Sequence, residues 1–184
     1  MSEADSLRAI LLRYEGVHFL LNREQCGSSR FVAESPKRSS GNPYLREVLR
    51  SGEVRTLLFD LDLFLVDTFR LRPGGAAQLA LMVGLGSLGE GSRTMLGKTV
   101  FPRLGSLALD RGSIAFRVPS NAVTRSLDLG ELEPNGRAIR KPLLRRGIVA
   151  LHLMEGSMGF LLDLDRLVAS GSLFAVTARE GESG

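Results

Sequence analysis

Two aspartates one residue apart, Asp60 and Asp62, directly follow the apolar run Val54 to Phe59. A carboxylate at the end of a buried strand can act as a nucleophile, and a second carboxylate beside it can act as general acid and base. The same position suits a structural role, because an aspartate after a strand can accept hydrogen bonds from the free N–H groups of a following helix. Leu63 and Phe64 come next and are bulky and apolar, which predicts a buried helical turn and favours the capping role.

The segment Leu57 to Thr68 also resembles the first motif of the haloacid dehalogenase-like hydrolases, a strand followed by Asp-x-Asp-Gly-Thr. The resemblance implies a phosphatase in which Asp60 attacks phosphorus and Asp62 is the general acid and base. That family needs a sharp turn after the second aspartate, where this chain has two bulky residues. It also needs a Rossmann-like βαβ scaffold, for which the glycine-rich stretch 73–97 offers no long helix. A hydrolase is therefore the alternative function rather than the preferred one.

The other residues that could do chemistry lack partners in the sequence. Gly84 to Gly89 has dinucleotide-loop spacing, but no helical pattern follows it, so we expect a loop without a cofactor. Cys26 would need His18 or His152 as a base; His18 is predicted on the polar face of its hairpin and His152 on a strand face. One cysteine and two histidines also make a metal site implausible. We therefore predict no catalytic residue, no cofactor and no metal.

Composition places the chain among ordinary globular proteins. Its 184 residues are 43% apolar and 24% charged, which fits a folded domain with a sizeable core. No uninterrupted apolar run approaches the ~18 residues that a membrane span needs. The first five residues include Glu3 and Asp5 and no basic residue, so we expect no secretory signal and a cytoplasmic location.

The net charge of +4 raises the question of nucleic acid as a partner. The densest basic cluster lies within 137–146 and has no aromatic residue inside it, whereas nucleic-acid binders interleave the two. We therefore predict no nucleic-acid binding and expect this cluster to be a solvated connection between two apolar strands.

Short strand-like runs dominate the pattern. Seven apolar runs, bounded by glycines and prolines, are expected as strands: Leu7 to Tyr14, Val17 to Leu21, Val54 to Phe59, Leu79 to Val83, Ile114 to Val118, Gly147 to Met154 and Met158 to Leu162. Only Tyr44 to Arg50 and Asp163 to Ala169 are expected as short helices. Gly27 to Pro43 is expected as a long loop around one short strand near Phe31, and Gly84 to Gly97 as a crossover between two lobes.

A weak internal repeat supports two lobes built on one plan. Gly52 to Asp62 and Gly156 to Asp165 each combine a turn glycine, an apolar strand and Asp-Leu-Asp. The two aspartates that end the strands, Asp60 and Asp163, are both expected as helix caps.

The order of these segments resembles the CheW-like domain, an adaptor family that couples chemoreceptors to the histidine kinase CheA. Two opening strands are followed by Tyr44 to Gly52, similar to the family's Leu-Arg-Gly segment, and by an apolar strand ending in Asp-Leu. Arg146 to Leu151 with Phe160 to Leu167 resembles the family's closing pattern, Gly-Val followed by Leu-Leu-Asp-Leu-Asp-x-Leu. Ser51 departs from the pattern, because it separates Arg50 from Gly52 where the family has Arg-Gly adjacent.

The resemblance implies a mainly β fold of two five-stranded β-barrel lobes with a few short helices. Residues 1–184 would form a single CheW-like domain, with lobe one at about 17–110, lobe two at about 111–160 and both chain ends crossing between the lobes. The implied function is a non-enzymatic chemotaxis adaptor. Its implied partners are the regulatory domain of a CheA-type histidine kinase and the cytoplasmic tip of a chemoreceptor, without insertion into the membrane.

The resemblance also assigns individual residues. Arg50 matches the arginine of the Leu-Arg-Gly segment, so it is the expected protein-interaction residue near a groove between the lobes. Gly52 and Gly147 are expected as structural turn positions, and Asp60 and Asp163 as helix caps.

Overall fold

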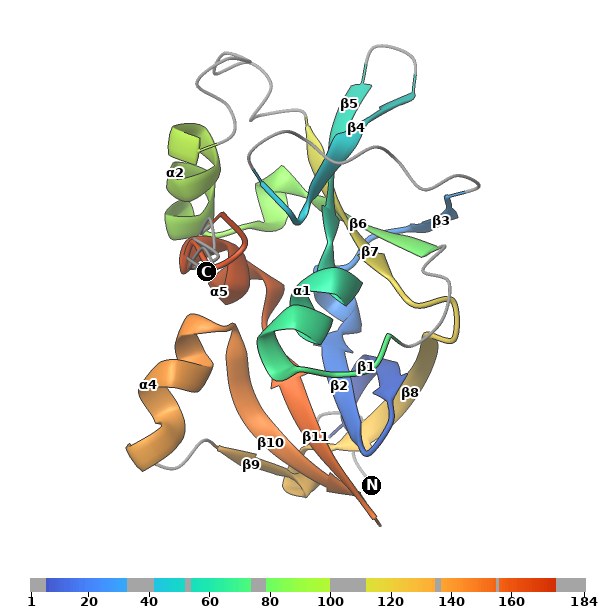
Figure 1. Cartoon of the computed structure of the whole chain (residues 1–184), viewed down its shortest axis with the longest axis vertical. Helices are drawn as coiled ribbons and strands as arrows, with labels where there is room; N and C mark the ends of the chain where they lie inside the picture. The colour runs from blue at the N-terminus through green and yellow to red at the C-terminus, as the bar shows by residue number, and fades with distance from the viewer. Residues whose placement is uncertain are drawn as a thin grey trace, which may run out of the picture.

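The computed structural model describes residues 6–32, 42–51, 54–73, 79–99, 112–134, 137–154 and 156–174 (Figure 1). The described strands form one sheet of six and one sheet of five strands. Among the described residues, no helix combines the length and the apolar character needed to cross a membrane.

The six-stranded sheet has the order β8-β1-β2-β11-β10-β9. Its strands are β1 (Ser6–Tyr14), β2 (Val17–Asn22), β8 (Val123–Asp128), β9 (Leu132–Pro134), β10 (Ile148–Met154) and β11 (Ser157–Leu162). β2 and β11 run parallel, with His18 opposite Gly159, and they join the opening hairpin to the closing one. The first two strands and the last two described strands thus belong to one sheet.

The five-stranded sheet has the order β3-β6-β7-β5-β4. Its strands are β3 (Ser29–Phe31), β4 (Leu45–Ser51), β5 (Val54–Asp60), β6 (Leu79–Gly84) and β7 (Ser113–Val118). Only β5 and β7 are parallel. β3 and β4 are the two edges, so three strands separate them.

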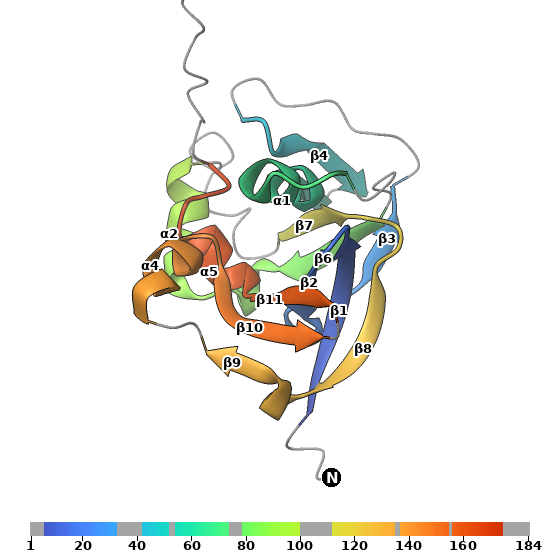
Figure 2. The ribbon, with the colours of Figure 1, turned by 60° about the horizontal axis from the view of Figure 1, so that its bottom comes forward.

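Helices fill the junction and one side of the molecule. The α-helices are α1 (Leu61–Phe69), α2 (Glu90–Thr99), α4 (Arg137–Arg145) and α5 (Leu164–Ala169), and short 3-10 turns are η2 (Arg23–Gln25), η3 (Leu85–Ser87) and η4 (Leu129–Glu131). α2, α4 and α5 gather on one side in both views (Figures 1 and 2). α2 is attached to α5 through Asp165, whose Oδ1 accepts from the Gly89 N–H at 2.7 Å and whose carbonyl accepts from the Ser92 hydroxyl at 2.6 Å.

One large hydrophobic core joins both sheets to α1 and α5. Phe19 from the first sheet and Phe59 and Phe116 from the second are fully buried in it, and burial of a side chain of this kind contributes about 1.5–3 kcal/mol. A smaller cluster of Ala9, Leu11, Leu20 and Leu127 fills the opposite face of the six-stranded sheet.

The structure confirms the mainly β fold and all seven predicted strands, with ends shifted by one residue at most. It also confirms the short strand at Phe31 and the helix that follows Asp163. Three local predictions are wrong. Tyr44 to Arg50 contains strand β4 instead of a helix, Gly84 to Gly97 contains most of α2 instead of a loop, and the basic cluster forms helix α4 instead of an open connection.

The boundaries between the two sheets fall at other residues than the expected lobe boundaries. β2 (Val17–Asn22) pairs in the six-stranded sheet rather than in lobe one, and β7 (Ser113–Val118) pairs in the five-stranded sheet rather than in lobe two. The chain passes between the sheets after Asn22 and again between Val118 and Val123. One sheet has six strands because the opening hairpin joins β8 on one side and β11 on the other.

Candidate protein-interaction site

A groove of about 150 Å³ lies where β1 and β8 of one sheet approach β3 and β6 of the other. Its lining residues come from both sheets and from η2: Ile10, Arg23, Ser28, Ser29, Leu79, Leu81, Ala122 and Thr124. Ile10 and Leu81 contribute little accessible surface, because they are only 5% and 3% exposed. The serine and threonine hydroxyls and the Arg23 guanidinium therefore make up much of the accessible lining.

Phe31 of β3 lies beside this groove. It pairs with Leu79 across β3 and β6, while Ser29 pairs with Leu81. Directly paired residues on neighbouring strands point to the same face of a sheet, so Phe31 is on the face that lines the groove. Its side chain is 82% exposed. It is the most exposed of the large apolar side chains among the described residues.

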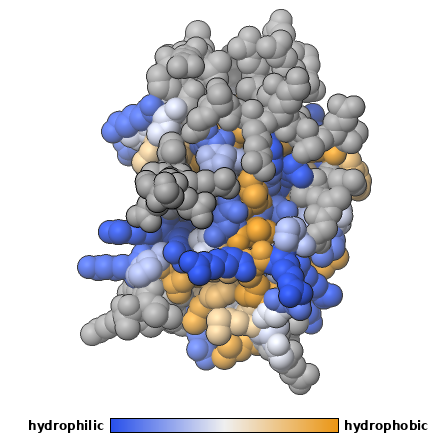
Figure 3. Space-filling view, viewed as in Figure 1, coloured by the Kyte–Doolittle hydropathy of each residue, from blue (hydrophilic) through white to orange (hydrophobic). Residues whose placement is uncertain are grey.

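Figure 3 shows a second apolar surface, a band that runs down the middle of this face from the region of α1 toward β10 and β11. Phe69 of α1 and Phe160 of β11 are partly buried and stack on each other, with ring centroids 5.7 Å apart. Arg146 lies 5.6 Å above the Phe69 ring and covers part of it with a cation. This band is therefore partly shielded, whereas Phe31 is not.

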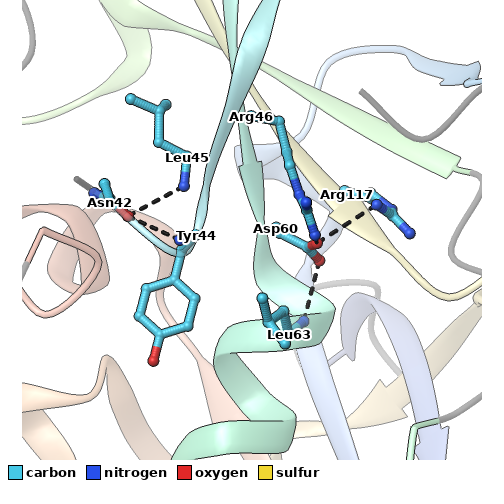
Figure 4. Close-up of polar contacts among 7 residues, drawn as sticks. All are labelled: Asn42, Tyr44, Leu45, Arg46, Asp60, Leu63 and Arg117. Atoms are coloured by element: carbon cyan, nitrogen blue, oxygen red, sulfur yellow. Dashed lines mark hydrogen bonds and ion pairs between the residues drawn. The ribbon is translucent and has the colours of Figure 1, made fainter. Parts of the chain in front are cut away.

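Asp60 holds the elements of the five-stranded sheet together at the start of α1 (Figure 4). As the N-cap of α1, it accepts a hydrogen bond from Leu63 N–H through Oδ1 at 3.1 Å. Its Oδ2 accepts from Arg46 Nε of β4 at 3.0 Å and forms an ion pair with Arg117 Nη1 of β7 at 3.5 Å. Asp60 is only 2% exposed and Arg46 8%, so this carboxylate is enclosed by the groups that neutralise it.

Asp62 links α1 to the other sheet. The Tyr14 hydroxyl of β1 donates to Asp62 Oδ1 at 2.7 Å, and both side chains are buried. Burial raises the pKa of Asp62, and the hydrogen bond from Tyr14 opposes that shift. Burial, with Asp62 beside it, also raises the pKa of Tyr14, so the hydroxyl stays a donor. The contact fixes the six-stranded sheet to α1 and thereby to the five-stranded sheet.

Replacing Tyr14 with phenylalanine is expected to lower the free energy of unfolding by about 1–3 kcal/mol at pH 7, because the buried Asp62 carboxylate loses its donor. The loss should shrink in acid, since a protonated carboxyl no longer needs that donor. Urea denaturation at pH 7 and pH 4.5 measures both values. Equal stability of the two proteins at pH 7 would contradict the role given to this hydrogen bond.

Asp163 and Gly147 lie together at the start of α5. Asp163 is the N-cap of α5; its Oδ1 accepts from Arg166 N–H at 3.0 Å and from the Gln25 amide at 2.9 Å. Gly147 has a φ of +78° and its carbonyl accepts from Asp163 N–H at 2.8 Å. A Cβ at Gly147 would lie 2.7 Å from Leu167 Cβ, so the turn needs glycine both for its backbone angle and for space.

Arg50 lies on edge strand β4, where its backbone pairs with Arg55. β4 is the edge opposite β3, so the sheet order separates Arg50 from the groove described above. Gly52 lies outside the residues that the structure describes.

The histidines and the cysteine are buried. His18, expected on a polar face, is 3% exposed, and its Nε2 lies 2.9 Å from Nδ1 of His152. Nothing in the sequence signals this pairing, because it depends on β11 lying between β2 and β10. Burial raises the pKa of the Cys26 thiol to about 11, so it stays protonated near neutral pH and is a poor nucleophile. Among the described residues, no group of three or more His, Cys, Asp or Glu side chains could hold a metal ion.

The hydrolase alternative finds little support in this geometry. The two-sheet fold differs from the Rossmann-like scaffold that the alternative requires. Asp60 is buried and bound by two arginines, and Asp62 is bound by a tyrosine. Both carboxylates serve contacts within the protein.

No family model matches the sequence, and no curated protein matches it. Among solved structures, the fold is similar to the scaffolding protein TtCheW from Thermoanaerobacter tengcongensis, with a TM-score of 0.57 and 10% sequence identity. The similarity covers 93% of this chain and 89% of that one. It shows that the chain has the CheW-like fold, in agreement with the resemblance seen in the sequence.

Proposed function

We propose that this chain is a chemotaxis adaptor that works without catalysis, coupling chemoreceptors to a CheA-type histidine kinase in the cytoplasm. The observation that carries the proposal is the CheW-like fold, which extends over nearly the whole chain and is shared with a scaffolding protein. The buried state of Asp60 and Asp62 adds to it, because the sharpest enzyme-like motif is engaged in structural contacts.

We assign the receptor tip to the groove between the sheets. Chemoreceptor tips are helical, and an amphipathic helix binds through a few apolar side chains that contact exposed apolar residues of its partner. Phe31 would contact the apolar side of the helix from β3, and the partly exposed Leu79 beside it would extend that contact. Arg23 is held beside the groove, because its Nη1 donates to the Gly27 carbonyl at 3.0 Å.

We assign the kinase regulatory domain to a different surface, the β4 edge of the five-stranded sheet with Arg50. Edge strand β4 presents backbone N–H and C=O groups to which a strand of another β-rich domain can hydrogen-bond. Two partners on opposite edges of one sheet can bind at the same time, as coupling requires.

The test is binding of the purified protein to a receptor-tip fragment and to the kinase regulatory domain, measured by calorimetry for the wild type and for Phe31→Ser. Phe31→Ser is expected to weaken receptor-tip binding at least about tenfold, since a central aromatic contact is worth about 2 kcal/mol or more. Kinase binding should not change. The fold should be preserved, because the side chain is 82% exposed.

The matched control is Leu153→Ser, an exposed apolar residue on β10, for which no effect on either partner is expected. Absence of binding to both partners at high micromolar concentration would remove the assigned function. A phosphatase activity that Asp60→Asn abolishes would support the hydrolase instead.

A further inference from the structure

Four side chains form a continuous hydrogen-bonded chain inside the six-stranded sheet. Ser157 Oγ of β11 lies 2.8 Å from His18 Nδ1 of β2, and His18 Nε2 lies 2.9 Å from His152 Nδ1 of β10. His152 Nε2 then lies 3.3 Å from Glu131 Oε2 of η4. The two rings are 3% and 1% exposed, so the bond between them is largely shielded from water, and a surface pocket borders only its His18 and Ser157 end.

Gly159 is what allows the two histidines to meet. It lies between them in the sheet, opposite His18 on β2 and opposite His152 on β10. A Cβ at this position would lie 2.1 Å from His18 Nε2. The absent side chain therefore opens the space through which one ring reaches the other.

The acceptors fix where the protons are when both rings are neutral. Glu131 accepts only, so His152 carries its proton on Nε2 and presents a lone pair from Nδ1. His18 then carries its proton on Nε2 and donates it to His152, while the Ser157 hydroxyl donates to His18 Nδ1. All three hydrogen bonds of the chain are formed in this arrangement.

The pair can hold one further proton but not two. With one added proton the Ser157 hydroxyl turns from donor to acceptor, and a single proton still bridges the rings. With two added protons both facing nitrogens carry N–H groups, so the bond between them is lost and two cations meet at 2.9 Å.

We propose that the His18–His152 pair is an acid-sensitive clasp that closes the six-stranded sheet and opens when the second proton is added. The clasp ties β2 to β10 and, through Glu131, to the turn η4 that connects β8 with β9. Opening separates these elements and exposes the small apolar cluster, in which Leu20 lies two residues beyond His18 on the same face.

The charges around the pair set the pH range. His18 faces His152 on β10, Arg13 on β1 and Arg125 on β8, while Glu131 contacts His152 from η4. The pKa of His18 is lowered from 6.5 to about 4. Burial is the largest cause, followed by the charges of His152, Arg13 and Arg125. Because the folded state takes up the proton less readily than the unfolded state, its stability is complete above about pH 6.5 and falls as the pH approaches 4.

Imidazole ¹⁵N NMR tests the clasp directly, because the chain has only two histidines. At pH 7 the expected spectrum shows His18 as the Nε2–H tautomer, and its titration midpoint is expected about two pH units below the ordinary value. Two independent titrations near pH 6.5 in the folded protein would overturn the proposal. The wild-type spectra suffice for this result, whatever the variants do.

Urea denaturation between pH 7.5 and pH 4 tests the consequence for stability. His18→Gln removes the titrating ring. Between pH 6.5 and pH 4 the variant is therefore expected to lose less free energy of unfolding than the wild type. Protonation of the 20 acidic residues affects both proteins alike and cancels in the difference. Gly159→Ala should part the rings and raise the His18 midpoint only in part, because it removes the contribution of His152 but not that of burial. Parallel stability curves for wild type and His18→Gln would contradict the clasp.

Discussion

Replacing Asp60 with alanine is expected to lower the free energy of unfolding by about 3–5 kcal/mol, because it leaves Arg46 buried without its counter-ion. Arg46 is 8% exposed and directs Nε and Nη2 at the Asp60 carboxylate. The same substitution removes the cap of α1 and the ion pair with Arg117. Urea denaturation at pH 7 measures the change.

Asp163→Ala is the matched control, since Asp163 also caps a helix after a strand but forms no ion pair with a buried arginine among the described residues. Loss of this cap and of the hydrogen bond from the Gln25 amide should together cost about 1–2 kcal/mol. Adding Arg46→Met to Asp60→Ala should recover part of the stability, because it removes the unpaired charge. Equal costs for the two aspartate substitutions would show that the ion pairs contribute nothing.

The strands could be predicted from the sequence because their pattern is local. Runs such as Ile114 to Val118 alternate or stay apolar over their whole length and end at glycine or proline, and such runs form strands in almost any arrangement of a sheet. Asp60 and Asp163 could be predicted as helix caps for the same reason, since each stands between a strand and a helix.

The errors occur where tertiary contacts decide the structure. Tyr44 to Arg50 alternates charged and apolar residues without a clear period, and its strand conformation follows from pairing with β5 and from the contact of Arg46 with Asp60. α2 begins in a glycine- and serine-rich stretch of low helix propensity. It is stabilised by Leu96, which is fully buried, and by the contacts with Asp165 of α5.

The groove and the histidine pair depend on strand order, which no local pattern contains. The groove exists because β8 lies beside β1 while β3 lies beside β6. His18 and His152 are 134 positions apart and meet only because β11 pairs with both of their strands. Residues that interact across a sheet edge or through a glycine gap must therefore be found from the structure.

Gly147→Ala is expected to lower the free energy of unfolding by about 3 kcal/mol, for two reasons that add. A left-handed backbone costs a non-glycine residue about 1–2 kcal/mol, and Gly147 has a φ of +78°. The new Cβ would also lie 2.7 Å from Leu167 Cβ and 3.1 Å from the Asp163 carbonyl, and such overpacking typically costs about 1–3 kcal/mol. Neither neighbour moves easily, because Leu167 is buried in α5 and the Asp163 backbone is bound to Gly147.

Gly16→Ala separates the two causes. Gly16 has nearly the same φ, +76°, but no atom lies within 4 Å of the Cβ position, so only the backbone term of about 1 kcal/mol is expected. Thermal and urea denaturation of both variants measure the difference, which reports how tightly α5 is packed onto the start of β10. Because Asp163 N–H donates to the Gly147 carbonyl, this turn and the cap of α5 form one unit. If both variants lose the same free energy of unfolding, α5 shifts to accommodate the methyl group added at Gly147.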